Sequence, residues 1–362
     1  MSKIHNFSAG PSILNQDVLK KASEAVVNFN NLNLSILEIS HRSKDFVAVM
    51  DNAVALVKEI LDVPEGYSVL FLQGGASTGF LNTVFNFMNE HGTGAYLNTG
   101  AWSKKALQEA KKLGNLNLIA SSEDNNFNYI PKGYTVPSDS DYFHITTNNT
   151  IFGTQIKDIP TQDGTLLIAD MSSDIFSRKI NVSDYAMIYA GAQKNLGPAG
   201  TTLYIVKDDL LGKTDRTIPT MLDLSVHADK GSMFNTPPVY PIYVSMLTLE
   251  WLKANGGIEW IEKVNEEKAA LLYNEIDNNP LFEGTAALED RSNMNVTFVL
   301  TNQNLKENFD KIWNAAGISG INGHRSVGGY RASIYNAMPK ESIQVLVNTM
   351  KQLAKEYDLV NI

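Results

Sequence analysis

One lysine stands among unusually small neighbours. Lys194 lies within residues 189–200, which read Tyr-Ala-Gly-Ala-Gln-Lys-Asn-Leu-Gly-Pro-Ala-Gly, and it follows an apolar segment, residues 186–190, that predicts a strand. Small neighbours let the backbone approach a flat ligand closely and leave the amine partly desolvated. Desolvation lowers the pKa of a lysine and makes it nucleophilic toward a carbonyl, as in Schiff-base lysines. The alternative is a surface turn whose lysine points to water.

A carboxylate follows another apolar run. Residues 165–169 read as a buried strand of a parallel sheet, and Asp170 comes directly after them. Ligands of open α/β sheets bind outside the carboxyl ends of the strands. A carboxylate there can keep a pyridinium nitrogen protonated, which is the partner that pyridoxal phosphate needs. Asp170 could instead cap a helix, because Met-Ser-Ser follows it. Taken with Lys194, it favours the cofactor.

A glycine-rich turn supplies a third element of a cofactor site. Residues 67–72 read as a strand, and Gln-Gly-Gly-Ala-Ser-Thr-Gly follows at residues 73–79, before an apolar run typical of a helix. Backbone N–H groups at such a helix N-terminus bind anions. The turn is neither a Walker A sequence nor a G-x-G-x-x-G fingerprint, which argues against a nucleotide. Many such turns are glycine-rich for tightness alone. Trp102 could offer a flat face to a pyridine ring or simply fill a core.

Five stretches together resemble a known family. They are residues 6–11 (Asn-Phe-Ser-Ala-Gly-Pro), 40–43 (Ser-His-Arg-Ser), 190–195 (Ala-Gly-Ala-Gln-Lys-Asn), 231–238 (Gly-Ser-Met-Phe-Asn-Thr-Pro-Pro) and 323–333 (Gly-His-Arg-Ser-Val-Gly-Gly-Tyr-Arg-Ala-Ser). The chain resembles the phosphoserine aminotransferase family, whose members are class-V, fold-type-I pyridoxal-phosphate enzymes. The resemblance covers essentially the whole chain.

The resemblance implies a role for each matching residue around the cofactor. Lys194 corresponds to the Schiff-base lysine, Asp170 to the partner of the ring nitrogen, and Trp102 to the aromatic residue that stacks on the ring. The remaining cofactor contacts fall on Thr150, at the ring oxygen side, and on Ala76, Ser77 and Gln193 around the phosphate. Asn235 and Thr236 match residues that reach the phosphate of the neighbouring subunit, which implies a homodimer with shared active sites.

Substrate recognition follows from charge. A guanidinium pairs with a carboxylate through two parallel hydrogen bonds, and by resemblance Arg331 takes the α-carboxylate. The distal phosphate or carboxylate falls to a cluster of His41, Arg42, His324 and Arg325. In the family the partner subunit supplies His324 and Arg325. Without the resemblance, such His-Arg pairs could also be solvated turns.

Two positions differ from one branch of the family. Some members carry serine where this chain has Ala9, and arginine where it has Ser77. Ala9 offers only backbone groups to a substrate. Ser77 removes one possible donor to the distal anion, so the set of anion donors is left open.

The implied reaction is reversible transfer of the amino group of L-glutamate to 3-phosphohydroxypyruvate, giving O-phospho-L-serine and 2-oxoglutarate. This step belongs to serine biosynthesis, and in some bacterial members the family also serves pyridoxine biosynthesis. Three other readings stay open. They are another class-V aminotransferase, such as one acting on serine or alanine with glyoxylate, a cofactor-binding or regulatory module without catalysis, and a nucleotide-binding α/β protein.

Composition narrows the function further. The formal net charge of −9 disfavours nucleic-acid binding, which needs basic surface to neutralise phosphate. The chain has no cysteine, which excludes disulfides, thiolate metal sites and the cysteine nucleophile of cysteine desulfurases. No metal site is predicted. No segment approaches 18 apolar residues, and the first residues lack the apolar stretch of a signal peptide. We therefore expect a cytoplasmic protein without a membrane partner.

The elements that must position these residues alternate along the chain, which favours an α/β fold with a mainly parallel sheet. Helices are predicted at residues 17–28, 46–61 and 244–254, and strands at 68–72, 95–98, 142–146, 165–170, 202–206 and 295–300. Apolar residues between 343 and 357 recur at helical spacing and predict a final amphipathic helix.

A glycine turn at residues 255–257 marks a boundary between domains. The family fold implies a large cofactor-binding domain with a seven-stranded sheet at residues 16–257. It also implies a smaller α+β domain at residues 258–362, joined by the N-terminal segment 1–15.

Overall fold

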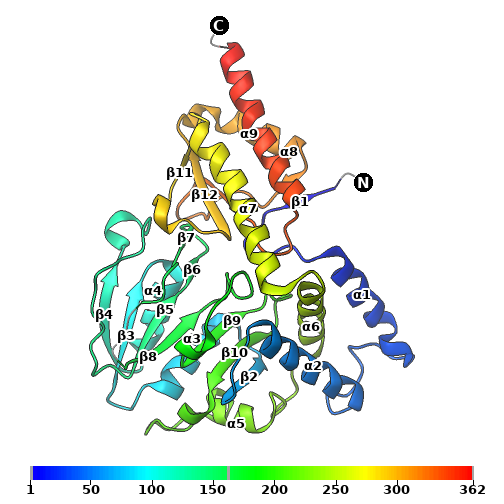
Figure 1. Cartoon of the computed structure of the whole chain (residues 1–362), viewed down its shortest axis with the longest axis vertical. Helices are drawn as coiled ribbons and strands as arrows, with labels where there is room; N and C mark the ends of the chain where they lie inside the picture. The colour runs from blue at the N-terminus through cyan, green and yellow to red at the C-terminus, as the bar shows by residue number, and fades with distance from the viewer. Residues whose placement is uncertain (1–2, 161–163, 361–362) are drawn as a thin grey trace.

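A seven-stranded sheet forms the centre of the computed structural model, which describes residues 3–160 and 164–360 (Figure 1). From edge to edge the strands are β2 (Tyr67–Leu72), β10 (Thr202–Lys207), β9 (Met187–Gly191), β8 (Leu166–Asp170), β5 (Tyr142–Thr146), β3 (Thr93–Asn98) and β4 (Asn115–Ser121). Strand β10 runs antiparallel to both of its neighbours, and the other pairs are parallel. The predicted α/β fold with a mainly parallel sheet is confirmed.

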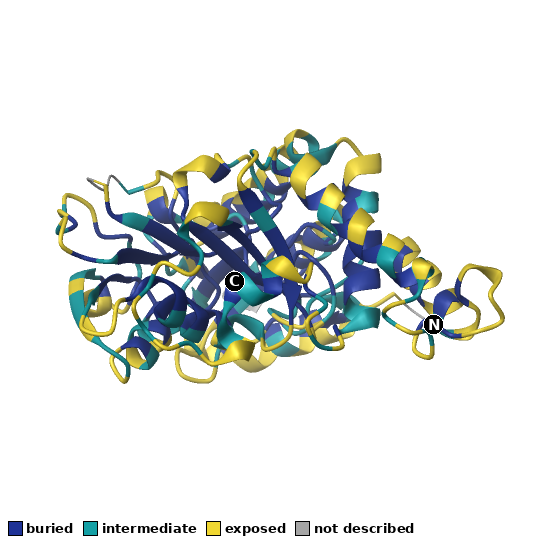
Figure 2. Cartoon of the chain, turned by 90° about the horizontal axis from the view of Figure 1, so that it is seen from below, coloured by how far each residue is buried: buried dark blue, intermediate teal, exposed yellow. Residues whose placement is uncertain are grey.

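Helices cover both faces of this sheet. One face packs against α1 (Gln16–Val27), α2 (Lys44–Ile60) and α6 (Val239–Ala254), and the other against α3 (Gly75–Phe87), α4 (Ala101–Ala110) and α5 (Leu224–Asp229). Strands buried on both faces need apolar residues at every position, which explains their continuous apolar runs. Figure 2 shows the strands in dark blue, with exposed residues gathered on the outer sides of the helices and in the loops.

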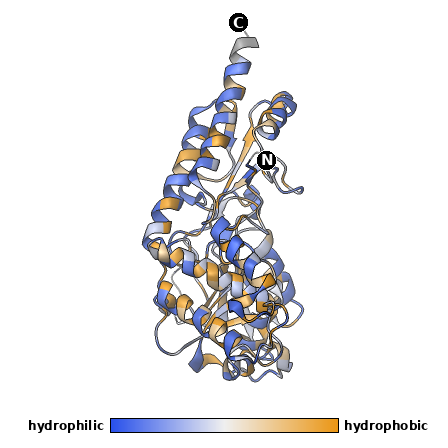
Figure 3. Cartoon of the chain, turned by 90° about the vertical axis from the view of Figure 1, so that its right-hand side faces the viewer, coloured by the Kyte–Doolittle hydropathy of each residue, from blue (hydrophilic) through white to orange (hydrophobic). Residues whose placement is uncertain are grey.

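A second core lies beside the large sheet. It contains the antiparallel strands β11 (Phe282–Gly284), β12 (Asn295–Leu300) and β14 (Tyr330–Ser333), with α7 (Gly257–Asn278), α8 (Lys306–Ala315) and α9 (Lys340–Val360). The N-terminal strand β1 (His5–Asn6) pairs with β13 (Ile318–Ser319), and Phe7 is buried in this core. Figure 3 shows α7 and α9 with hydrophobic residues among hydrophilic ones. The domain limits at residues 15 and 257 stay predictions.

Two elements differ from the sequence expectation or escaped it. Helix α6 begins at Val239, five residues before the predicted start, and all of its residues from Ile242 to Leu249 are buried. A helix that is apolar on all sides shows no periodic stripe from which its start can be read. Strand β4 was not predicted, because it is a partly exposed edge strand of mixed composition.

The strands β6 (Asn148–Asn149) and β7 (Thr154–Gln155) form an antiparallel hairpin directly after the carboxyl end of β5. Within the described residues, the helices are all too short or too polar to cross a membrane.

Candidate active site

The carboxyl ends of β5, β8 and β9 open into a cavity of about 360 Å³. Asp170 is the last residue of β8, and Lys194 follows the end of β9 by three residues. Both side chains are buried and line the cavity. Thr150, just after β6, accepts a hydrogen bond of 2.6 Å from the Lys194 Nζ to its Oγ1. The register of a parallel sheet therefore brings together residues that lie 20 to 44 positions apart in the chain.

Burial shapes the charge of the central lysine. Removal from water lowers the pKa of Lys194 to about 8, and the nearby Arg331 pushes it the same way. The carboxylates of Asp170 and Asp174 oppose this shift. The result is an amine that loses its proton far more readily than a surface lysine.

The pKa of Asp170 is shifted upward, in the opposite direction to that of Lys194. Burial raises the pKa of its carboxyl group, while hydrogen bonds from Ser172 and the charge of Lys194 pull it down. One of these bonds runs 2.9 Å from the Ser172 backbone N–H to Asp170 Oδ1. A cation facing this carboxylate would be held firmly, because the Asp170 side chain is buried.

The glycine turn at residues 73–75 has the predicted order of strand, turn and helix. Gly74 caps α3 with a φ of +110°, and a Cβ built there would lie 2.0 Å from Thr78 Oγ1. Only glycine fits this position. Gly74 directly precedes a 13-residue helix, whose first backbone N–H groups have no partner within the helix. Gly75, Ala76 and Ser77 line the cavity, so it holds a helix N-terminus suited to an anion.

An aromatic wall closes one side of the cavity. Trp102 is the second residue of α4, and its ring centroid lies 5.9 Å from Lys194 Nζ. Lys105 Nζ lies 4.5 Å from the same centroid. Lys105 was not among the predicted residues, although its position three residues after Trp102 on a helix places both on one face.

Orphaned polar atoms provide a test of whether pyridoxal phosphate fits. Among the described residues, Trp102 Nε1, Thr146 Oγ1 and Arg331 Nε are buried without a hydrogen-bond partner, and all three residues line the cavity. Unpaired buried polar groups are costly, so a polar ligand that pairs with them is favoured. The groups of pyridoxal phosphate have matching partners here. The helix N-terminus suits its phosphate, the carboxylate suits its ring nitrogen, the lysine suits its aldehyde, and the indole offers a flat face to its ring. The residues fit the cofactor.

An arginine and a histidine are also part of the cavity wall. Arg331, on β14, and His324 both line it. Burial lowers the pKa of both side chains, and the charges of Arg331, Arg325 and Lys105 lower that of His324 further. An anion bound near His324 would lie close to several positive charges. It would reduce the free-energy cost of burying those charges.

The remaining predicted residues do not line this cavity. They are His41, Arg42, Asn235, Thr236 and Arg325. The backbone carbonyl of Thr236 accepts a bond of 2.7 Å from Gln73 Nε2. His324 lines the cavity of its own chain, and its contribution to a partner's cavity stays a prediction. His324 lies in the loop before β14, and the charge of Arg331, which is on β14, lowers its pKa.

Sequence reasoning missed several wall residues. Thr146, at the end of β5, could have been found by the argument that identified Asp170. For the N-terminal segment the only signal was the resemblance at residues 6–11. Gly10 lines the cavity, and Ser12 Oγ donates a bond of 2.6 Å to the Lys194 carbonyl oxygen, across 182 positions of sequence. Gln193, which was predicted, also lines the cavity, and its carbonyl oxygen accepts from the Ser12 N–H at 3.0 Å.

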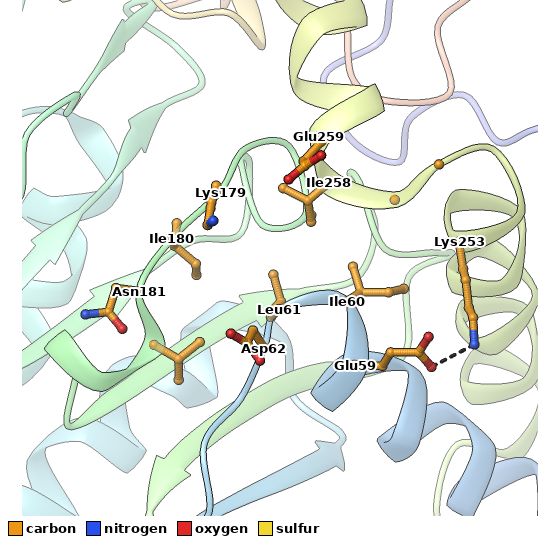
Figure 4. A pocket seen from close by; sticks show the side chains of 13 residues that line it. Glu59, Ile60, Leu61, Asp62, Lys179, Ile180, Asn181, Lys253, Ile258 and Glu259 are labelled. Atoms are coloured by element: carbon orange, nitrogen blue, oxygen red, sulfur yellow. Dashed lines mark hydrogen bonds and ion pairs between the residues drawn. The ribbon is translucent and has the colours of Figure 1, made fainter.

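A larger cavity, of about 550 Å³, lies elsewhere (Figure 4). It is bounded by the end of α2, residues 179–182 and the junction of α6 with α7. Its Glu59 and Lys253 already form an ion pair of 2.7 Å, and both are about half exposed. The predicted residues lie outside its described lining. We therefore place the chemistry in the smaller cavity.

Comparisons with known proteins agree on one family. The family model "Aminotransferase class-V" matches residues 4–346. The phosphoserine aminotransferase of Flavobacterium johnsoniae is 61% identical over 352 residues, which cover 97% of this chain and 99% of the relative. A solved phosphoserine aminotransferase, studied for radiation damage of its Schiff base, has a TM-score of 0.96 at 45% identity, with coverage of 98% and 100%.

The pyridoxal-phosphate-bound phosphoserine aminotransferase of Trichomonas vaginalis has a TM-score of 0.92 at 34% identity, covering 96% of this chain and 100% of that one.

Proposed function

We propose a specific reaction for this chain, which belongs to the phosphoserine aminotransferase family of class-V aminotransferases and is a pyridoxal-phosphate-dependent aminotransferase. In this reaction the amino group of L-glutamate passes to 3-phosphohydroxypyruvate, giving O-phospho-L-serine and 2-oxoglutarate. The observation that carries the proposal is that Lys194 and Arg331 line one cavity together with the anion turn at Gly75.

Lys194 has two tasks in the proposed mechanism. Its amine, with a pKa lowered to about 8, would hold the cofactor, and when free of the cofactor it would move a proton at the substrate α-carbon. When bound, pyridoxal phosphate supplies the electron-accepting ring for this chemistry. Thr150 holds the amine at 2.6 Å, and the buried Asp170 carboxylate keeps a proton on the ring nitrogen by charge pairing.

The other residues bind and orient. The N–H groups at the start of α3, with Ala76, Ser77 and Gln193, hold the phosphate, and Trp102 shields one ring face from water. Arg331 takes the α-carboxylate that both amino-acid substrates share. Its guanidinium has an unpaired buried Nε, so a carboxylate satisfies a donor that is otherwise orphaned.

Positive charge around His324 supports a substrate with a second anion. Arg325 and Lys105 both act on His324 electrostatically, in addition to Arg331. Lys105 offers a cation in a chain where Ser77 replaces the arginine of some members. A class-V enzyme that acts on alanine with glyoxylate needs no such group, which favours phosphoserine and glutamate as the substrates and serine biosynthesis as the process.

We also propose a homodimer. Asn235 and Thr236 lie outside the cavity of their own chain, as expected if they serve the cavity of a partner subunit. The cytoplasmic location stays a prediction.

The proposed reaction is tested by following 2-oxoglutarate release from L-glutamate with 3-phosphohydroxypyruvate or glyoxylate as the acceptor. We expect transfer to the phosphorylated acceptor and little to glyoxylate. Lys194→Ala should keep the wild-type circular dichroism and lose transfer altogether. Transfer to glyoxylate alone would favour the other class-V activity, and undiminished turnover by Lys194→Ala would remove the assigned role of this lysine.

A further inference from the structure

A second lysine is buried without belonging to the site described above. Lys268 lies in the middle of α7 with 0% of its side chain exposed. Its Nζ donates to three backbone carbonyl oxygens, those of Ile334 at 3.0 Å, Tyr335 at 2.8 Å and Met338 at 3.3 Å. In residues 3–160 and 164–360 no carboxylate forms an ion pair with it. The carbonyl groups are therefore its partners.

The number of acceptors matches the charged form of this side chain. An ammonium group has three N–H donors and no acceptor, so three carbonyl oxygens satisfy it fully. Burial lowers the pKa of Lys268 to about 7. A buried charge with complete hydrogen bonding fixes its surroundings more firmly than an apolar side chain, because its partners cannot move without leaving it unpaired.

The three carbonyls belong to the segment 334–338, which joins β14 to α9 and follows Arg331 by only three residues. This segment also touches the lysine loop of the large sheet. The N–H of Asn336 donates to Asn195 Oδ1 at 3.0 Å, and its Nδ2 donates to the Phe176 carbonyl at 2.8 Å. Asn195 is the residue next to Lys194. One short segment thus connects the residue that binds the substrate carboxylate with the loop that carries the reactive amine.

The same segment reaches the cavity wall. Tyr335 Oη donates to the Ala9 carbonyl at 2.7 Å and accepts from Asn295 Nδ2 at 3.1 Å. Ala9 lines the cavity. Displacement of the segment would therefore move the N-terminal wall, Arg331 and the lysine loop relative to one another.

We propose that Lys268 is a positioning residue, which holds the segment 334–338 through its three carbonyl bonds and so sets the distance between Arg331 and Lys194. The proposal rests on the proposed function, in which Arg331 takes the substrate carboxylate. Lys268 does not touch the substrate or the cofactor. Its effect should appear in how tightly an amino acid binds, while the cofactor, held mainly by the large sheet's loops, should remain bound.

The test compares Lys268→Met with a matched control, Leu272→Ala. Leu272 lies one turn further along α7, is fully buried, and contributes apolar packing to the same core. Both changes should lower the melting temperature of the cofactor-free protein. In the loaded proteins, glutamate is titrated against the visible absorption band of the bound cofactor. Hydrogen exchange of residues 330–338 is measured by mass spectrometry without substrate.

For Lys268→Met we expect about a tenfold weaker glutamate Kd, since small misplacements of a binding group have effects of this size or larger. The cofactor band should persist, and exchange in residues 330–338 should speed up. Leu272→Ala should keep the wild-type Kd and the wild-type exchange there. If Lys268→Met does not fold, Lys268→Gln, with two of the three donors, should show the intermediate effect.

Two outcomes would overturn the proposal. One is a wild-type glutamate Kd and wild-type exchange in both Lys268 variants, and the other is an equal loss in Leu272→Ala at a similar melting temperature. If wild-type protein itself does not respond to glutamate, the proposed function fails. Hydrogen exchange then still decides whether Lys268 holds the segment, because that measurement needs no substrate.

Discussion

The lowered pKa of Lys194 makes a measurable prediction about the cofactor-free protein. Only a neutral amine attacks the aldehyde of pyridoxal phosphate. With a pKa of about 8, roughly 10% of the Lys194 amine is neutral at pH 7. An ordinary lysine, with a pKa of about 10.5, is neutral to only about 0.03% at that pH, so the reactive fraction differs by about 300-fold.

The assay is the rate at which cofactor-free protein captures pyridoxal phosphate between pH 6 and pH 10, followed by stopped-flow absorbance. The same measurement on a free lysine analogue corrects for titration of the cofactor itself. The corrected rate should rise with pH, bend near pH 8, where about half of the amine is neutral, and level off above about pH 9, where the neutral fraction approaches one. Lys194→Ala should show no fast phase.

A second variant checks the cause of the shift. The Asp170 carboxylate raises the pKa of Lys194, against the effect of burial. Asp170→Asn removes this charge, so the bend in the capture rate should move to lower pH. A rate that keeps rising through pH 10 in the wild-type protein would refute the argument that burial has tuned this amine. A bend that moves upward in Asp170→Asn would refute the assigned electrostatics.

Two further predictions concern positions around the cavity. Gly79→Ala should destabilise the protein by about 1–3 kcal/mol despite the better helix propensity of alanine, measured by denaturant unfolding. The added Cβ would lie 2.5 Å from Tyr189 Cδ2 and push α3 from the sheet; an unchanged unfolding midpoint would contradict this packing. Arg331→Lys should weaken glutamate binding about tenfold while the cofactor stays bound, measured by spectral titration, because lysine lacks the two-pronged geometry. Unchanged binding would exclude Arg331 as the carboxylate anchor.

Much of the site could be predicted because its residues stand at the ends of strands. An apolar run predicts a strand, and a polar residue at or just after its end is expected at the carboxyl edge of the sheet, where ligands bind. Asp170 and Lys194 were found in this way. The glycine turn before α3 was readable for a similar reason, since Gly74 adopts a backbone conformation that other residues avoid.

Other features depend on contacts that sequence spacing does not encode. Lys268 looks like an ordinary exposed lysine of a long helix, and its burial follows only from the arrival of residues 334–338 beside α7. Ser12 binds the carbonyl oxygen of Lys194, although the two residues lie 182 positions apart in the sequence. Whether His324 lines its own chain's cavity or that of a partner also depends on how β14 sits beside the sheet. Chemistry at strand ends is local, whereas these contacts come from long-range packing.

The central claim is that one cavity combines cofactor chemistry at Lys194 with recognition of a doubly anionic substrate. Its most direct test adds O-phospho-L-serine, L-glutamate and L-alanine separately to the cofactor-loaded protein and records the visible absorption band. We predict that phosphoserine and glutamate bleach the band and that alanine leaves it intact. Bleaching by alanine alone would contradict the assigned substrates, and the lack of any visible band in the loaded protein would contradict the role of Lys194.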